Sequence, residues 1–468
     1  MSDPWRSGPT AAERVAERLR LEPPWEVFAE EADRYEVYLN GTRVELVRGP
    51  IAIEGYGLRL LRPSSGKLAT GFQASTNFSD AGIAEVIADA EAVLRHSEFP
   101  AAKAELPSGG GGSPSVQISD PKLWEDPARA VEEYVTELSN RFSGRTNVVL
   151  SFGAIRTTRV RTSLVNSSGL RRSYEHTLVS RELAIKASGG PEGSPAGEYW
   201  VDEGARRLET GSLGSEVDAW CRYAADARRA VAPPTGELAV VLPTTVLSGI
   251  LPPVVGLRCS GVGRLRNLSP AIDSTIGSEN LTIFDDQAYP WAQGSAPFDG
   301  EGTSAGRPTV IERGVLRGLL YDSLHAAAFG QRSTGNATRA GLAPREWLRF
   351  LHTPSSDVST LVVPPGSGGS DEELIEQAGD GLWVQQLGWA RPDPISGAFG
   401  GEIRIGYRIR HGKLAEPVRG GIVGGVAIAP QGAPSLLTRI AAVGARTELS
   451  ESLASPACLV RPLTVAGN

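Results

Sequence analysis

The side chains that could perform chemistry are few, and their spacing matches none of the common metal or nucleophile motifs. The histidines and cysteines are His96, His176, His325, His352, His411, Cys221, Cys259 and Cys458. The sequence has no His-Glu-x-x-His and no histidine pair at i, i+4, the spacing that places two imidazoles on one helical face for zinc. Neither a nucleophile elbow in a strand–helix context nor a phosphate-binding glycine loop is present. These residues therefore predict neither a zinc site nor a serine nucleophile nor a nucleotide site.

Acidic and glycine-rich segments offer two weaker chemical signals. Asp285-Asp286 and Asp299-Gly300-Glu301 lie on either side of an aromatic segment and could bind a hard cation or act as acid and base. The same carboxylates could instead accept backbone N–H groups in turns. Glycine-rich stretches at 397–401 and 420–425 could let a peptide approach a sheet edge, or could be plain loops. Cys458 lies in an apolar strand pattern, which predicts a buried, unreactive thiol.

Composition narrows the class of protein. The chain has 468 residues, of which 40% are hydrophobic, so we expect two or three domains with real cores. A formal net charge of -7 argues against a nucleic-acid binder. Three scattered cysteines make no disulfide framework, which favours a reducing compartment. The first 24 residues lack the apolar core of a secretory signal, and no stretch approaches the roughly 18 apolar residues of a membrane span. We therefore expect a cytoplasmic protein without a membrane partner.

The elements of the first half are predicted from hydrophobic spacing and turn residues. Helices are expected over 10–21, 80–94, 126–142 and 215–230, where Ser79 and Asp126 are suitable N-caps. Strands are expected over 25–29, 35–39, 42–48, 57–62, 68–73, 146–154, 159–166, 170–179 and 182–187, with Asn40-Gly41 as a hairpin turn. This predicts an N-terminal α/β unit with a mixed sheet. The segment 107–114 (PSGGGGSP) is predicted to be a flexible loop.

The second half is predicted to be rich in short strands. After Pro233-Pro234 the sequence predicts a strand over 237–242 and a helix from Thr244 that is disturbed by Pro252-Pro253. Short strands with Gly and Pro between them follow at 281–284, 309–312, 315–321, 361–363, 382–387, 403–410, 414–418 and 459–465. Such a pattern is typical of an antiparallel sandwich or barrel. We therefore predict an α+β fold with an N-terminal domain of residues 1–232 and a C-terminal domain of residues 233–468.

The order of motifs in the second half resembles the TldD/PmbA family, bacterial and archaeal proteins that work as peptidase subunits. The matching segments are 281–286 (LTIFDD), 298–302 (FDGEG), 310–322, 333–337 (STGNA), 381–384, 397–399, 406–409, 412–413 and 417–419. The first half agrees more loosely, at 55–61, 71–76 and 164–169 (LVNSSG). The resemblance covers nearly the whole chain, and the ordered series is more specific than any single motif.

The resemblance implies which branch of the family this chain joins. One branch, TldD-like, carries a His-Glu-x-x-x-His-type helix and a late cysteine that together bind zinc, while the PmbA/TldE-like branch lacks them. The equivalent segment here, 244–257 (TTVLSGILPPVVGL), has no His, Glu, Asp or Cys, and 446–455 has no Cys. The resemblance therefore implies a subunit with no catalytic or metal-binding residue, no cofactor of its own, and zinc on a TldD-like partner. Together the two chains would form a heterodimeric metallopeptidase that acts on an extended peptide.

Seven residues of these motifs are candidates for substrate binding or for the subunit interface. They are Asp299, Glu301, Asn336, Arg339, Phe399, Tyr407 and Arg419. Gly400 and Gly425-Val426 depart from the Ser and Asn that the family usually has there, which suggests a specialised relative, for example in natural-product or modified-peptide maturation. Two alternatives stay open. One is a homo-oligomeric peptide-binding scaffold without a peptidase partner, and the other is an independent enzyme that uses Asp285, Asp299, Glu301 or a histidine.

Overall fold

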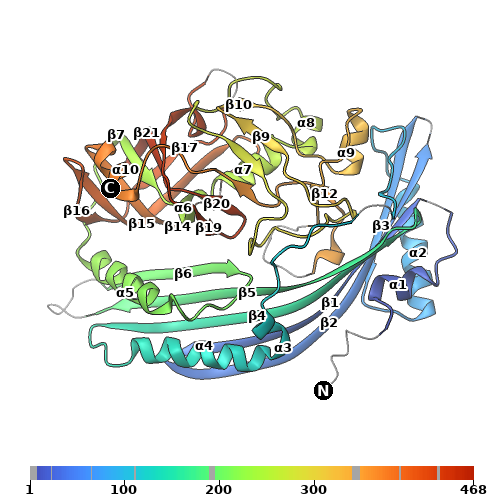
Figure 1. The fold of residues 1–468 in the computed structure, drawn as a ribbon, viewed down its shortest axis with the longest axis horizontal. Coiled ribbons are helices and arrows are strands. Elements are labelled where there is room, and N and C mark those ends of the chain that lie inside the picture. Colours follow the sequence, from blue (N-terminus) through green and yellow to red (C-terminus); the bar gives the residue numbers. More distant parts are fainter. Residues whose placement is uncertain are drawn as a thin grey trace.

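A long, curved sheet of six strands forms most of the first half of the chain in the computed structural model (Figure 1). The structure describes residues 8–22, 24–64, 66–109, 112–188, 196–339, 348–388, 390, 392–429 and 433–467. The strand order is β3-β2-β1-β4-β5-β6. The strands are Trp25–Asn40 (β1), Arg43–Ser64 (β2), Lys67–Ser75 (β3), Val148–Asn166 (β4), Arg171–Ala187 (β5) and Gly197–Ala205 (β6).

This sheet differs from the predicted one in two ways. Every neighbouring pair of strands runs antiparallel, whereas the sequence predicted a mixed sheet. Four pairs of predicted strands are also joined into the single long strands β1, β2, β4 and β5. The ladder continues through the polar residues between the predicted pieces. Glu30 and Glu31, for example, pair with β2 on one side and with β4 on the other.

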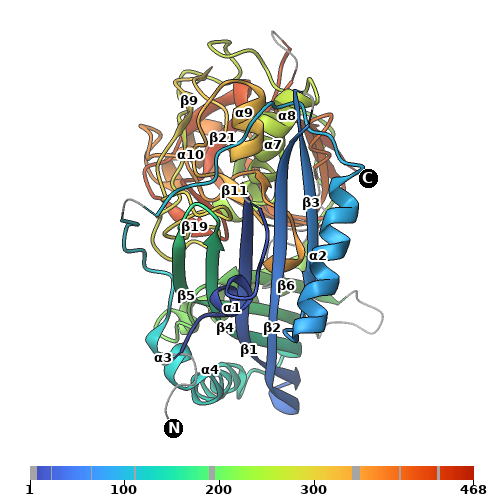
Figure 2. The ribbon, with the colours of Figure 1, turned by 90° about the vertical axis from the view of Figure 1, so that its right-hand side faces the viewer.

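Helices cover one face of the sheet. They are Ala11–Ala16 (α1), Asp80–Leu94 (α2), Pro121–Glu125 (α3), Pro127–Phe142 (α4) and Leu213–Arg229 (α5). Ser79 and Asp126 cap α2 and α4 as predicted, because each side chain accepts a hydrogen bond from a backbone N–H of the first turn. Figure 1 shows α4 on the face of the sheet turned away from the second half of the chain, and Figure 2 shows α2 beside β3. The other face of the sheet is left for the second half.

The second half is built around a closed barrel. The strands β14-β7-β21-β17-β15 are hydrogen-bonded in that order, and a further pairing of β14 with β15 closes the ring, which removes the free sheet edges. The barrel strands are Gly236–Leu242 (β7), Gly381–Gly388 (β14), Ala398–Arg410 (β15), Ile422–Val426 (β17) and Cys458–Ala466 (β21), with Lys413–Val418 (β16) and Ile440–Val443 (β18) attached. With the first-half sheet, this barrel confirms the predicted α+β class.

A second sheet lies beside the barrel and shares its hydrophobic core. Its strands, in the order β10-β9-β8-β13-β20-β19, are Val315–Leu316, Thr309–Glu312, Ile283–Asp285, Leu361–Val362, Leu453–Ser455 and Glu448–Ser450. Ala337–Thr338 (β11) pairs with Ser355–Ser356 (β12). The helices are Thr244–Leu247 (α6), Leu251–Arg258 (α7), Gly261–Leu265 (α8), Ser323–Ala328 (α9) and Asp371–Ala378 (α10), with 3-10 turns at Arg349–Leu351 (η1) and Leu437–Arg439 (η2). None of the helices in the described ranges is long and apolar enough to cross a lipid bilayer.

The two halves pack against each other through apolar side chains and a close backbone approach. Phe28 and Leu164 of the sheet form one hydrophobic cluster with Phe298 and Phe350 of the second half. The Phe350 ring lies where a Cβ at Gly55 would be, so this glycine of β2 allows η1 to reach the sheet. The last helix of the first half ends at Arg229 and the first barrel strand begins at Gly236. The division at 232/233 stays a prediction, and the predicted loop 107–114 includes Gly110 and Gly111, which lie outside the described residues.

Candidate functional site

The segment that the resemblance equates with a zinc-binding helix is broken into two short helices. Pro252 and Pro253 lack an amide N–H, so a helix tolerates them in its first turn and not in its interior. Accordingly α6 ends at Leu247, and α7 begins at Leu251 with the prolines in its first turn. The structure thus confirms the predicted disturbance of this helix.

The side chains of this segment do not fit a zinc ion. Val246, Leu247, Val254 and Val255 are buried in the main core. Thr244 is buried as well, and its hydroxyl donates a hydrogen bond of 2.6 Å to the Ser455 carbonyl. The whole segment lies within the described residues, and it offers no imidazole, carboxylate or thiolate, which are the groups that bind zinc in proteins.

The cysteines and histidines elsewhere offer no substitute for those ligands. Burial raises the pKa of Cys259 and of Cys458 to about 12, so both thiols stay protonated at neutral pH, and the predicted burial of Cys458 is confirmed. His176 is buried, and its pKa is lowered by burial and by nearby guanidinium groups. His325 shares a contact of 2.7 Å between its Nδ1 and the Asp322 carboxylate. Across the described ranges, no group of three His, Cys, Asp or Glu side chains could hold a metal ion.

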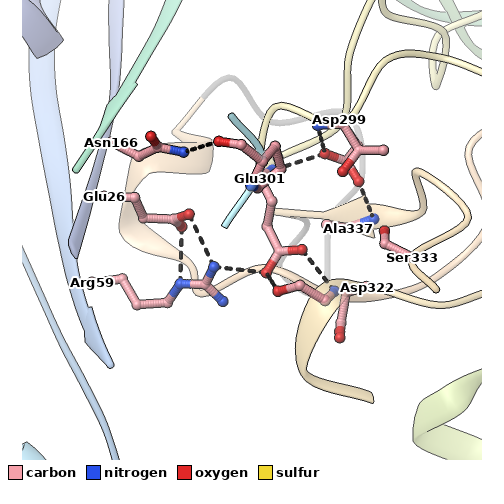
Figure 3. Close-up of polar contacts among 12 residues, drawn as sticks. Glu26, Arg59, Asn166, Asp299, Glu301, Asp322, Ser333 and Ala337 are labelled. Carbon is pink, nitrogen blue, oxygen red and sulfur yellow. Dashed lines mark hydrogen bonds and ion pairs between the residues drawn. The ribbon is translucent and has the colours of Figure 1, made fainter. Parts of the chain in front are cut away.

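Four of the seven candidate residues, Asp299, Glu301, Asn336 and Arg339, lie together where the second half meets the long sheet. Glu301 is completely buried and contacts the Arg59 guanidinium of β2 at 2.6 Å (Figure 3). Its carboxylate also accepts hydrogen bonds from the Ser323 backbone N–H at 2.8 Å and from the Ser323 hydroxyl at 2.6 Å. Glu301 is therefore held by partners from two sides.

Glu26 of β1 completes a buried cluster of four charges with Arg59, Glu301 and Arg339, which we call the interdomain charge cluster. The Arg59 Nε lies 2.9 Å from one Glu26 oxygen, and the Arg59 Nη2 donates to the other at 2.9 Å. The Arg339 guanidinium also donates to Glu26, and it lies 4.5 Å from the centre of the Phe28 ring. Within this cluster two carboxylates are paired with two guanidinium groups, which offsets the cost of burying each charge.

A second ion pair lies next to this cluster. Glu30, also on β1, is 1% exposed, and its carboxylate accepts a hydrogen bond of 2.7 Å from the Arg349 Nε and another of 2.7 Å from the Arg349 backbone N–H. The same guanidinium donates to the Tyr174 hydroxyl at 3.0 Å and to the Thr162 hydroxyl at 2.7 Å. Arg349 is thereby fixed to three strands of the sheet.

Asp299 lies at the edge of the cluster, on the wall of a cavity of about 130 Å³ that Arg339 and Arg349 also line. Its carboxylate accepts hydrogen bonds from the backbone N–H groups of Glu301, Thr303 and Ala337, at 2.8–3.1 Å (Figure 3). Loss of contact with water and the nearby Glu301 carboxylate raise the pKa of Asp299 to about 8. Asp299 therefore stabilises the loop that carries Glu301, which is the turn role that the sequence left open.

Asn336 lies deeper and satisfies a different carboxylate. Its side-chain amide donates to Asp285 and accepts a hydrogen bond of 2.9 Å from the Gln287 side chain. Asp285 also accepts hydrogen bonds of 2.9 Å from Ser359 and Thr360, and burial raises its pKa to about 6. These bonds occupy both Asp285 oxygens, which favours a structural role over an acid–base one.

The remaining three candidates do not join this site. Phe399 is buried inside the barrel. The Tyr407 hydroxyl donates a hydrogen bond of 2.7 Å to Asp226 of α5, on the outside of the barrel. The backbone N–H of Arg419 bonds to the carbonyl of Val231 in the connection between the halves. No finding tests whether any of the seven binds substrate or partner, and for all of them that role stays a prediction.

Sequence reasoning missed Glu26, Glu30, Arg59 and Arg349. A usable signal was present, because Arg59 stands between Leu58 and Leu60 inside the predicted strand 57–62. A charged residue in such a run is either exposed on an edge strand or paired in the interior. Its partner could not be read from the sequence, since Glu301 is 242 residues away.

The raised pKa of Asp299 predicts a pH-dependent stability. Because its folded-state pKa lies above the ordinary value of 3.8, the folded protein retains a proton that the unfolded chain has released between about pH 4 and 8. The stabilisation that this proton gives to the folded state is present at low pH and is lost as the pH rises towards 8. The free energy of unfolding should fall by at most about 1.4 kcal/mol per pH unit.

Replacing Asp299 with Asn should make the free energy of unfolding, measured in urea, depend less steeply on pH. The window from pH 6 to 8 is the informative one, because Asp285 and Asp357 have pKa values of about 6. An unchanged slope in Asp299→Asn would contradict the assignment.

Another cavity lies away from the interdomain charge cluster, between β6, α6 and β14. It has a volume of about 660 Å³. Its walls include Trp200 of β6, Thr245 of α6, Ser248 directly after α6, and Gln386 of β14. This cavity, which we call the β6 groove, therefore lies against the segment that the resemblance equates with a zinc-binding helix, and it combines hydrogen-bonding groups with the exposed Trp200 ring.

Comparison with known proteins gives a consistent family relationship. Residues 235–467 match the family described as the PmbA/TldA metallopeptidase C-terminal domain. A metalloprotease of Archaeoglobus fulgidus is 28% identical over 193 residues, which cover 41% of this chain and 43% of the relative. A metalloprotease TldD homolog of Haemophilus influenzae is 27% identical over 223 residues, covering 47% of this chain and 43% of the relative. Each alignment thus spans less than half of the relative's length.

One solved structure shows how far the fold is shared. The crystal structure of TldE from Thermococcus kodakarensis aligns with 97% of this chain and 99% of its own, with a TM-score of 0.76 and 18% sequence identity. At that identity the likeness concerns the fold. It extends over both the long sheet and the barrel.

Proposed function

Since the chain belongs to the TldD/PmbA family of metallopeptidases, we propose that it is a zinc-free, TldE-like subunit of a two-chain peptidase. In this proposal a TldD-like chain supplies the zinc and the hydrolytic step. The present chain closes the substrate chamber and helps to hold an extended, unfolded or modified peptide. The location is proposed to be cytoplasmic.

The observation that carries this proposal is the chemistry of the α6–α7 segment. At the place where a TldD-like chain would have histidines and a glutamate, the side chains are aliphatic and enter the core. Two polar side chains of this segment, those of Thr245 and Ser248, line the β6 groove. They can hydrogen-bond a peptide but cannot replace zinc ligands. Such a segment suits a wall of a substrate chamber.

The glycines that depart from the family pattern support a specialised substrate. Gly400 of β15 pairs directly with Gly424 of β17, and Phe399 pairs with Gly425. This stretch of the barrel therefore carries few side chains, so a peptide backbone could approach it closely. We accordingly place the substrate among unfolded or chemically modified peptides, such as precursors in natural-product maturation.

A reconstitution experiment tests whether peptide cleavage needs both chains and which of them carries the zinc. The purified chain, a TldD-like chain from the same organism, and their mixture are each incubated with an unstructured peptide, and cleavage is followed by mass spectrometry. We expect no cleavage by this chain alone and a rate in the mixture that rises to a plateau at one chain per partner. Elemental analysis should find zinc in the TldD-like chain and well below one zinc per molecule in this one.

Two outcomes would overturn the proposal. Full hydrolysis by the TldD-like chain alone would show that this subunit is dispensable. Stoichiometric zinc together with hydrolysis in the isolated chain would show that it is an enzyme in its own right. A stable homodimer that binds peptide without ever enhancing cleavage would favour the scaffold alternative.

A further inference from the structure

Strand β6 has an outer edge that is available for pairing. It is the last strand of the six-stranded sheet, and β5 is its neighbour on the inner side. Within the described part of the chain, no strand pairs with its outer side. A sheet edge of this kind can accept a further extended chain through backbone hydrogen bonds.

One contact shows which residues present their backbone to that edge. The Gln386 side chain donates a hydrogen bond of 2.6 Å to the Trp200 carbonyl. Since the N–H and C=O of a residue in an antiparallel strand point to the same side, the Trp200 N–H also points outward. Alternate residues such as Glu198 and Asp202 share this orientation. The hydrogen bond from Gln386 thus already imitates the first contact of an added strand.

The β6 groove runs along this edge. Its volume of about 660 Å³ lies within the range of about 300–1,000 Å³ that is common for ligand sites. Trp200 is 40% exposed there and offers an indole face to a ligand. Thr245, Ser248 and Gln385 supply hydrogen-bonding groups on the opposite wall. The groove therefore provides both a backbone edge and side-chain contacts.

Most of the ionisable side chains in the groove wall are acidic. Its wall contains one guanidinium, that of Arg404, and five carboxylates, those of Glu182, Glu198, Asp202, Glu203 and Glu451. Glu182 lies 3.3 Å from Arg156, Glu198 lies 3.7 Å from Lys186 and Glu203 pairs with Arg181, but these three cations are not part of the groove wall. Glu182 and Glu198 are 37% and 39% exposed, so their ion pairs are weak, and the groove wall holds more carboxylates than guanidinium groups.

We infer that the β6 groove binds an extended peptide that adds to the outer edge of β6 and carries lysine or arginine side chains towards its carboxylates. This inference rests on the proposed function and names the class of substrate that this subunit selects. Backbone pairing with β6 orients the peptide without regard to sequence. The carboxylates and the Trp200 ring then favour cationic side chains by charge and by cation–π contact.

Binding to the isolated full-length chain tests the inference without the partner. Two fluorescein-labelled, unstructured ten-residue peptides are compared by fluorescence anisotropy, one with three lysines and one with three glutamates at the same positions. We expect the lysine peptide to bind about tenfold more tightly in low salt and the preference to shrink in high salt.

Matched variants identify the site. Glu182→Gln with Glu198→Gln should weaken binding of the lysine peptide by about threefold to tenfold and leave the glutamate peptide little changed. The control is Glu85→Gln with Glu91→Gln, which removes the same charge from exposed positions on α2. Trp200→Pro removes an outward N–H and should abolish binding of both peptides, while Trp200→Phe keeps that N–H and should retain most of it.

These experiments can overturn the inference about the β6 groove without overturning the proposed two-chain peptidase. Equal affinity for both peptides, or equal losses in the groove variant and its control, would overturn the inference even if cleavage by the two-chain mixture is intact. Weakened assembly with the TldD-like chain at unchanged peptide affinity would show that a partner segment occupies the groove, and would also overturn it. If Trp200→Pro does not fold, the charge variants still decide. Conversely, the groove can bind peptide in a chain that proves to have no peptidase partner.

Discussion

Replacing Arg59 with Met is expected to lower the free energy of unfolding by about 3–5 kcal/mol, the usual effect of removing one partner from a buried ion pair. Arg59 is 2% exposed and contacts Glu26 and Glu301, both of which are completely buried. The variant would leave two buried carboxylates with Arg339 as the one remaining guanidinium of the cluster. Denaturant unfolding followed by tryptophan fluorescence and circular dichroism measures the change.

The control for this prediction lies on the same strand. Arg48→Met also replaces a guanidinium of β2, but Arg48 is 58% exposed and lies 3.9 Å from its carboxylate partner, so it should cost about 1 kcal/mol or less. Adding Glu301→Gln to Arg59→Met should recover part of the loss, because it removes one of the two uncompensated charges. Equal effects of Arg59→Met and Arg48→Met would show that the interdomain charge cluster does not stabilise the fold.

Truncating Phe350 to Ala should cost about 3–5 kcal/mol, because the ring is 1% exposed and fills the contact between η1 and the sheet. A Cβ at Gly55 would overlap this ring, so Gly55→Ala should also destabilise the native chain. In the Phe350→Ala background the ring is gone, and Gly55→Ala should then cost much less. The coupling between the two changes, measured by thermal and denaturant unfolding, is expected to be about 0.5–3 kcal/mol.

The matched control for this cycle is Gly66→Ala. A Cβ at Gly66 would meet nothing within 4 Å, and its cost comes from the positive φ of 81°. That cost should be the same with and without Phe350. Additive effects of Gly55→Ala and Phe350→Ala would mean that the contact of η1 with β2 is not formed in solution.

Local elements could be predicted from the sequence where a local interaction defines them. The caps of α2 and α4 and the broken helix at Pro252 are of this kind, and each involves residues within a few positions of one another. Helix α10 was missed although Ser370 and Glu373 form a capping box, a signal that the sequence contains. Strand β6 was missed because its exposed face carries charged residues, which hide the alternation.

Long-range features could not be predicted in the same way. The ladder between the long strands β1 and β4 joins residues more than 100 positions apart, as in the pairing of Glu31 with Arg161. The pairing of β7 with β21 in the barrel and the approach of Arg339 to Glu26 likewise join residues that are far apart in the sequence. Asp299, Glu301, Asn336 and Arg339, four of the seven candidates, lie together in the structure, although the sequence did not predict that they are neighbours. Their partners on the sheet, Glu26 and Arg59, could be identified only from the structure.

The contacts between the halves constrain how this chain can diversify. Arg59 with Glu301, Arg339 with Glu26, and Arg349 with Glu30 each join a residue of the sheet to one of the second half. A gene that acquired a foreign second half by recombination would lose all three complementary pairs at once, and would bury unmatched charges at the seam. Viable chimeras should therefore be those that transfer all six residues as a set, so the two halves are expected to descend together rather than to be shuffled as independent modules.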